Sequence, residues 1–215
     1  LEMKPLFDSY VLNHGYRHSE TSFSNMYTWQ EAWDMKMATH GNALFISMYS
    51  DVYKPFLLPP YLKDDRESIE PYMKMCEEYM VENFGVFYLK CATPQMVEKI
   101  KADCGERYDF AYDEYNTEYV YNASDLIDLA GKKYHSKRNH INAFLRTYTS
   151  EFDLYDDKYR EECLQLQRDW AQDKDGDPRE AEEEILSIRK ALDHWRELNF
   201  KGCVVKINGK VVAFS

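Results

Sequence analysis

Hydrophobic residues return at helical spacing in several segments of the chain. Between residues 64 and 83, apolar and aromatic side chains recur every three or four positions, and Gly85 follows them. Such spacing places these side chains on one face of an amphipathic helix. The same pattern predicts further helices at 22–33, from Thr93 onward, and at 133–147, 159–171 and 181–199, with a short helical turn at 124–130.

Short runs rich in β-branched and aromatic residues lie between these helices and indicate strands. The clearest run is 204–214, where Asn208-Gly209 is flanked by β-branched residues, which is the strongest local signal for a hairpin. Pro59-Pro60 ends another run, because proline cannot donate to a central strand ladder. Strands are predicted at 42–48, 56–58, 86–89, in the tyrosine-rich stretch 108–122, and at 152–155.

The order of these segments predicts an α/β (α+β) protein. The β-α-β-α-β order before Asn122 favours a mixed sheet with helices packed on it, and we assign this first domain to residues 1–123. A basic linker helix is expected at 124–150. A second domain, with the order β-α-α-β-β, is expected at 151–215.

Composition and charge narrow the classes of partner. The chain has 215 residues, and its 38 acidic side chains outnumber 27 basic ones, giving a net charge of -11. This balance argues against nucleic-acid binding over the whole surface and against a DNA partner, but it permits one local basic patch. No apolar run is long enough to predict a transmembrane helix, and no segment signals a specific protein partner.

The cysteines suggest reduced thiols. All five are scattered, and no pair has the two-residue spacing of a zinc or redox site. We therefore expect a cytoplasmic protein without a disulfide framework.

No metal site is expected. His14 and His18 have the i, i+4 spacing of paired ligands but lack an accompanying glutamate motif, which favours surface or capping roles. The acidic run 173–177 resembles the start of a calcium loop, but Pro178 occupies the position of the required glycine. No Ser-His-Asp motif, P-loop or dinucleotide fingerprint is present, so no catalytic residue is assigned.

One stretch is basic, although the chain as a whole is acidic. Residues 129–150 contain 22 residues without an acid. Two interpretations stay open: a solvated basic face whose cations pair with acids of the sheets, or a site for the phosphates of a transfer RNA or a nucleotide-bearing donor. Asn139 could bond a backbone group and fix the helix. The candidate anion-binding residues are Lys132, Lys133, Lys137, Arg138 and Asn139.

The same stretch carries a family resemblance. Residues 129–144 read L-A-G-K-K-Y-H-S-K-R-N-H-I-N-A-F and match the pattern L-x-G-K-K-x-x-x-K-R-N-x-I-N-x-F without a gap. With this pattern the chain resembles bacterial proteins that are similar to the C-terminal domain of phosphatidylglycerol lysyltransferase. The resemblance implies two GNAT-like (acyl-CoA N-acyltransferase-like) domains joined by this helix, and it implies that 151–215 hold the first half of a truncated second domain.

The resemblance also implies a reaction class. Such proteins transfer an aminoacyl or acyl group from an activated donor to an amine or hydroxyl acceptor, without a covalent nucleophile. The possible donors are an aminoacyl-tRNA and acyl-CoA, and no other cofactor is assigned. The alternative is a GNAT-like module that binds an anionic ligand and has no catalytic activity.

Overall fold

The structure divides into two compact units. The computed structural model describes residues 1–14, 18–50, 54–114, 117–173 and 176–215. The N-terminal unit is Leu1–Asn116 and the C-terminal unit is Thr117–Ser215. Within the described ranges, eight α-helices accompany two antiparallel sheets, so the expected combination of helices and sheets is confirmed at this level.

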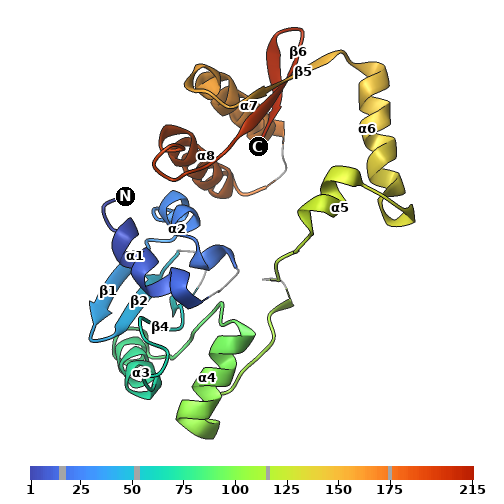
Figure 1. Cartoon of the computed structure of the whole chain (residues 1–215). Coiled ribbons are helices and arrows are strands. Elements are labelled where there is room, and N and C mark those ends of the chain that lie inside the picture. The colour runs from blue at the N-terminus through green and yellow to red at the C-terminus, as the bar shows by residue number, and fades with distance from the viewer. Residues whose placement is uncertain (15–17, 51–53, 115–116, 174–175) are drawn as a thin grey trace. The chain divides into compact units, whose positions relative to one another are not determined.

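The N-terminal unit combines a four-stranded sheet with four α-helices among its described residues (Figure 1). The strands are β1 (Lys36–His40), β2 (Ala43–Met48), β3 (Phe56–Leu57) and β4 (Tyr61–Leu62). The helices are α1 (Lys4–Val11), α2 (Phe23–Trp29), α3 (Glu70–Phe84) and α4 (Pro94–Cys104).

Strand β2 is the centre of the N-terminal sheet. It pairs with β1 along its length on one side. On the other side, β3 pairs with its Ser47–Met48 end and β4 with its Ala43–Leu44 end. The two partners are separate because Pro59 and Pro60 lack the N–H groups that a continuous strand would need. The predicted strands at 42–48 and 56–58 are therefore confirmed, and the sequence analysis missed β1 and β4.

The prediction of a mixed sheet is wrong for the described strands. Every pairing between the strands of the described residues is antiparallel. The predicted strand at 86–89 is reduced to one parallel bridge between Leu57 and Leu89, supported by a hydrogen bond from the Leu57 N–H to the Tyr88 carbonyl at 3.2 Å. β3 is only two residues long, so it offers too little backbone for a longer parallel ladder.

The tyrosine-rich stretch 108–122 is another correction. The described residues 108–114 and 117–122 contain no strand, and Tyr119 and Val120 are 88% and 86% exposed. Alternating aromatic residues predict a strand only when a neighbouring strand can accept their backbone hydrogen bonds. None of the described strands pairs with this stretch.

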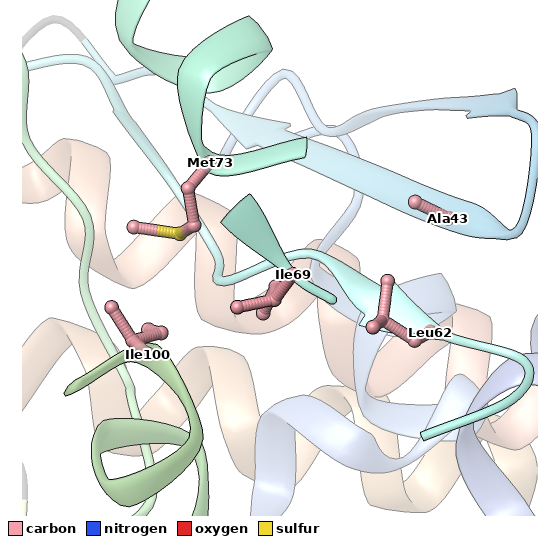
Figure 2. Close-up of a cluster of buried hydrophobic side chains, with 5 residues drawn as sticks. All are labelled: Ala43, Leu62, Ile69, Met73 and Ile100. Carbon is pink, nitrogen blue, oxygen red and sulfur yellow. The ribbon is translucent and has the colours of Figure 1, made fainter. Parts of the chain in front are cut away.

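Helices α3 and α4 pack their apolar faces against the sheet. Figure 2 shows Ala43 of β2, Leu62 of β4 and Ile69, just before α3, in one cluster with Met73 of α3 and Ile100 of α4. All five side chains are at most 2% exposed. The helical spacing of residues 64–83 therefore marked a real buried face, although α3 begins only at Glu70.

The C-terminal unit begins with two helices and continues into a three-stranded sheet. Strand order is β5-β6-β7, and both pairings are antiparallel. The elements are α5 (Ala123–Asp128), α6 (His135–Thr147), β5 (Ser150–Leu154), α7 (Arg160–Asp173), α8 (Pro178–Asp193), β6 (Cys203–Ile207) and β7 (Lys210–Phe214). The helix predicted at 181–199 is thus displaced toward the N-terminus, because Asp177 accepts a hydrogen bond from the Arg179 N–H and caps α8.

The predicted hairpin at 204–214 is confirmed. Asn208 and Gly209 connect β6 to β7 with φ angles of 52° and 78°. Both angles lie in the left-handed region that asparagine and glycine adopt most readily, so the turn matches the right-handed twist of the two strands. A register shift between Val205 and Lys206 adds a bulge to the hairpin.

One face of the C-terminal sheet forms a small core. Val204 of β6 is fully buried beside Cys163 of α7, and Val211 of β7 is 8% exposed. Tyr155 and Tyr159 complete this cluster, and the Tyr155 ring meets the Trp195 ring edge-on at 5.6 Å between centroids. Burial raises the pKa of the Tyr155 hydroxyl to about 12, so this side chain stays neutral in the core.

Candidate functional site

The acid-free stretch begins directly after helix α5 and folds into a turn followed by helix α6. α5 ends at Asp128, and the capping residue Leu129 adopts a left-handed φ of 47° and donates its N–H to the Asp125 carbonyl at 2.9 Å. Gly131, with φ of 81°, provides a second left-handed position before a 3-10 turn, Lys132–Tyr134, leads into α6. The predicted helix at 133–147 is confirmed, with its first turn in the tighter 3-10 form. We call residues 129–147 the basic segment (Figure 1).

Arg138 holds the turn of the basic segment together. Its guanidinium Nη1 donates to the backbone carbonyl of Leu129 and, at 2.8 Å, to that of Gly131. The side chain is half-buried, and a guanidinium can satisfy carbonyls left open at the end of α5. In this conformation the Arg138 guanidinium fixes the turn through two backbone carbonyls of the basic segment, and neither of these acceptors neutralises its charge.

Lys133 is paired with an acid in the structure. Its Nζ lies 2.9 Å from Asp125 Oδ2 and 4.8 Å from the centroid of the buried Tyr134 ring. The hydrogen bond from Lys133 lowers the pKa of the Asp125 carboxyl, which therefore remains charged at neutral pH. Sequence reasoning missed Asp125 because it lies before the acid-free run. Asp125 and Lys133 are eight residues apart on either side of the turn after α5, so helical spacing gave no signal for this pair.

Lys132 and Lys137 differ from these two cations. Both side chains are exposed, and neither has an ion-pair partner in the part of the chain that the structure describes. The first turn of α6 contains no acid, so the positive end of the helix dipole adds to their field. Cations at a helix N-terminus disfavour the helix slightly, and a bound anion would reverse that effect.

Asn139 lies on an exposed part of α6. Its Nδ2 is 3.0 Å from Nδ1 of His135, one turn earlier in the same helix. The bond is within α6, so Asn139 does not fix the helix to a backbone group of another element. The expected backbone contact of Asn139 is absent from the described hydrogen bonds.

Other chemical sites are not evident in the described ranges. No group of three or more histidine, cysteine or acidic side chains there could hold a metal ion. The acidic run 173–177 includes Lys174 and Asp175, which lie outside the described residues. None of the described helices is long and apolar enough to cross a bilayer.

Family comparison agrees with the local pattern of the basic segment. The family model described as "Phosphatidylglycerol lysyltransferase, C-terminal" matches residues 14–215. The chain belongs to this family. The resemblance inferred from residues 129–144 is thereby confirmed, and the family associates the chain with transferases that act on aminoacyl groups.

A solved structure has a similar fold. A conserved protein of unknown function from Bacteroides thetaiotaomicron superposes with a TM-score of 0.84 at 25% sequence identity. The alignment covers 99% of this chain and 71% of the Bacteroides protein. Among proteins with curated descriptions, none matches the sequence. The fold is therefore shared with a protein to which no function is assigned.

Proposed function

We propose that the chain is part of an aminoacyltransferase whose basic segment binds the phosphates of an aminoacyl-tRNA donor. In this proposal, residues 1–123 form one GNAT-like domain, 124–150 are the linker, and 151–215 belong to a second GNAT-like domain. The acceptor is an amine or a hydroxyl group. The observation that carries the proposal is the contrast between the structural roles of Lys133 and Arg138 and the unpaired state of Lys132 and Lys137.

The contrast supports binding because a purely structural basic helix would use its cations locally. The Lys133 charge is neutralised by Asp125, and Arg138 donates hydrogen bonds to two carbonyls. Each of these two cations therefore has a structural role. Lys132 and Lys137 form no side-chain hydrogen bond or ion pair in the part of the chain that the structure describes. In a chain of net charge -11, two exposed lysines without an ion-pair partner among the described residues favour an anionic ligand.

In this proposal, the protein promotes transfer by holding the donor and the acceptor next to each other. GNAT-like transfer places the donor carbonyl against the acceptor and needs hydrogen-bond donors toward the developing oxyanion. A phosphate-binding segment contributes by holding the donor, which lowers the entropic barrier of the transfer step. Acyl-CoA, which also carries phosphates, is the alternative donor, and a binding module without catalysis is the alternative function.

The test compares donors and charge variants. Binding of aminoacylated tRNA and of acetyl-CoA to the chain would be measured by fluorescence anisotropy and calorimetry. The double variant Lys132→Glu with Lys137→Glu should weaken tRNA binding about 10-fold or more and reduce the salt slope by about two contacts. A matched control, Lys201→Glu with Lys210→Glu, changes the same charge at two other exposed lysines and should have a much smaller effect.

The outcomes separate the alternatives. Equal weakening by the two double variants would mean that net charge alone matters, and the assignment to the basic segment would be wrong. Binding of acetyl-CoA that depends on Lys132 and Lys137, with no preference for tRNA, would favour an acyl-CoA donor. Binding of tRNA without transfer of its aminoacyl group to any acceptor amine or hydroxyl would favour the binding module.

A further inference from the structure

A hollow in the N-terminal unit has an apolar floor. Its volume is about 250 Å³. Met48 of β2 and Phe56 of β3 are register partners, so their side chains share one face of the sheet. Met80 of α3 joins them, and all three are at most 5% exposed. Figure 1 shows β1 beside β2 in this unit. This volume is below the range of pockets for drug-sized ligands, so the hollow suits a smaller molecule.

Aromatic side chains form the wall of the hollow. Tyr49 follows β2, and Tyr79 and Phe84 lie on α3. Their side chains are 44%, 46% and 41% exposed. The Tyr79 and Phe84 rings meet edge-on at 6.1 Å, which orients both rings. Exposed, mutually oriented rings can contact an apolar group and attract an ammonium group through their faces.

A pair of opposite charges also lines the hollow. Lys36 Nζ is 2.8 Å from Asp34 Oδ2, and the two side chains are 70% and 55% exposed. Such an exposed ion pair contributes little to stability, so its members can exchange partners at small cost. Asp34 has a left-handed φ of 35°, and the Met35 N–H bonds the Gln30 carbonyl at 2.9 Å beside it. The backbone that carries this carboxylate is thus held in an uncommon conformation.

We propose that this hollow binds a small zwitterion with an apolar side chain, of the α-amino acid class. The ammonium of the ligand replaces Lys36 on Asp34, and its carboxylate bonds the released Lys36. The apolar side chain lies on the floor formed by Met48, Phe56 and Met80. This site goes beyond the proposed donor-binding function, since it uses only residues of the N-terminal unit and none of the basic segment.

The experiment uses four probes that each test one part of the recognition. L-Phenylalanine carries all three features, phenethylamine lacks the carboxylate, 3-phenylpropionate lacks the ammonium, and glycine lacks the apolar side chain. Amide shifts of the isotopically labelled chain would be followed by NMR. L-Phenylalanine should bind with a Kd on the order of 1 mM, with shifts at residues 34–36, 47–49 and 79–84, and the other probes should bind at least about tenfold more weakly.

Charge variants give a second measurement. Asp34→Asn is chosen because asparagine tolerates the left-handed backbone, so the fold is retained. This variant should weaken L-phenylalanine binding about three- to fivefold, and Lys36→Gln should do the same. The matched controls Asp109→Asn and Lys74→Gln remove exposed charges of the same unit that do not line the hollow, and they should leave binding unchanged.

Three results would overturn the proposal. The first is the absence of saturable shifts with L-phenylalanine at concentrations about tenfold above the expected Kd. The second is equal affinity for phenethylamine or 3-phenylpropionate, which would exclude recognition of a zwitterion. The third is binding that Asp34→Asn and Asp109→Asn affect equally. The analogue series on the unchanged protein decides the question even if a variant does not fold.

Discussion

At the scale of single residues, the same side-chain chemistry has different consequences according to its local partners. Lys133 and Lys137 are four positions apart on the basic segment, yet among the described residues only Lys133 has an ion-pair partner. Asp103 shows the same dependence for a carboxylate. Its Oδ2 accepts the Ile69 N–H at 2.9 Å and lies 3.2 Å from Lys99 Nζ, so one acid joins α4 to the start of α3.

The Asp103 contact predicts a pH-dependent contribution to stability. The hydrogen bond from the Ile69 N–H, with help from Lys99, lowers the pKa of the Asp103 carboxyl. A lowered pKa in the folded state gives a contribution that is complete above the unfolded value of about 4 and is lost as the pH falls through the folded value. Asp103→Asn should therefore lower the free energy of unfolding by about 1 kcal/mol at neutral pH.

Chemical denaturation between about pH 3 and 7 measures this effect. The difference between the wild type and Asp103→Asn should shrink below about pH 4. Asp109→Asn, at an exposed position of the same unit, is the control and should show no such change. A difference that stays constant over the whole range would mean that the charge of Asp103 does not contribute.

At the scale of elements, helix ends depend on individual caps. The sequence predicted Thr93 as the cap of a helix with proline in its first turn, and the structure confirms both features. Thr93 Oγ1 accepts the Met96 N–H at 3.2 Å, which satisfies one of the open donors at the start of α4. α4 then contributes Ile100 to the core of the N-terminal unit.

Removing this cap should destabilise the N-terminal unit. Thr93→Ala leaves the Met96 N–H without its side-chain acceptor, and we expect a loss of about 1 kcal/mol in the free energy of unfolding. Urea denaturation followed by circular dichroism measures it. Thr149→Ala removes a threonine hydroxyl at an exposed position outside the helices and should change stability by much less. Equal losses in the two variants would argue against a capping role.

At the scale of the whole molecule, the acidic balance limits how a polyanion can bind. With a net charge of -11, most of the surface repels polyanions, and attraction is confined to places such as the basic segment. This arrangement predicts weak binding through few phosphate contacts. A protein that bound nucleic acid along an extended basic face would show many contacts and a steep dependence on salt.

The salt dependence of tRNA binding tests this localisation. If Lys132 and Lys137 supply the principal contacts, the logarithm of the association constant should fall with the logarithm of salt concentration with a slope of about -2. Anisotropy titrations over a series of potassium chloride concentrations give the slope. A slope several times steeper would show that other cations of the chain take part, and the two-lysine description would be wrong.

The sequence by itself determined the elements whose signals are local. The helical spacing in 133–147 and 159–171, the Asn208-Gly209 turn and the Thr93 cap depend on neighbours within a few positions, so they could be predicted. The family was predictable for the same reason, because the ungapped pattern at 129–144 is read directly from the chain.

Only the tertiary structure decided which partners the residues have. β1 was missed because its side chains are mostly exposed, and the stretch 108–122 was predicted as a strand although no described strand pairs with it. The separation of the basic residues into paired and unpaired cations, and the hollow beside Asp34 and Lys36, depend on contacts between segments. Hydrogen-bond partners, ion pairs and burial are set by distances in space, which composition and spacing along the chain do not specify.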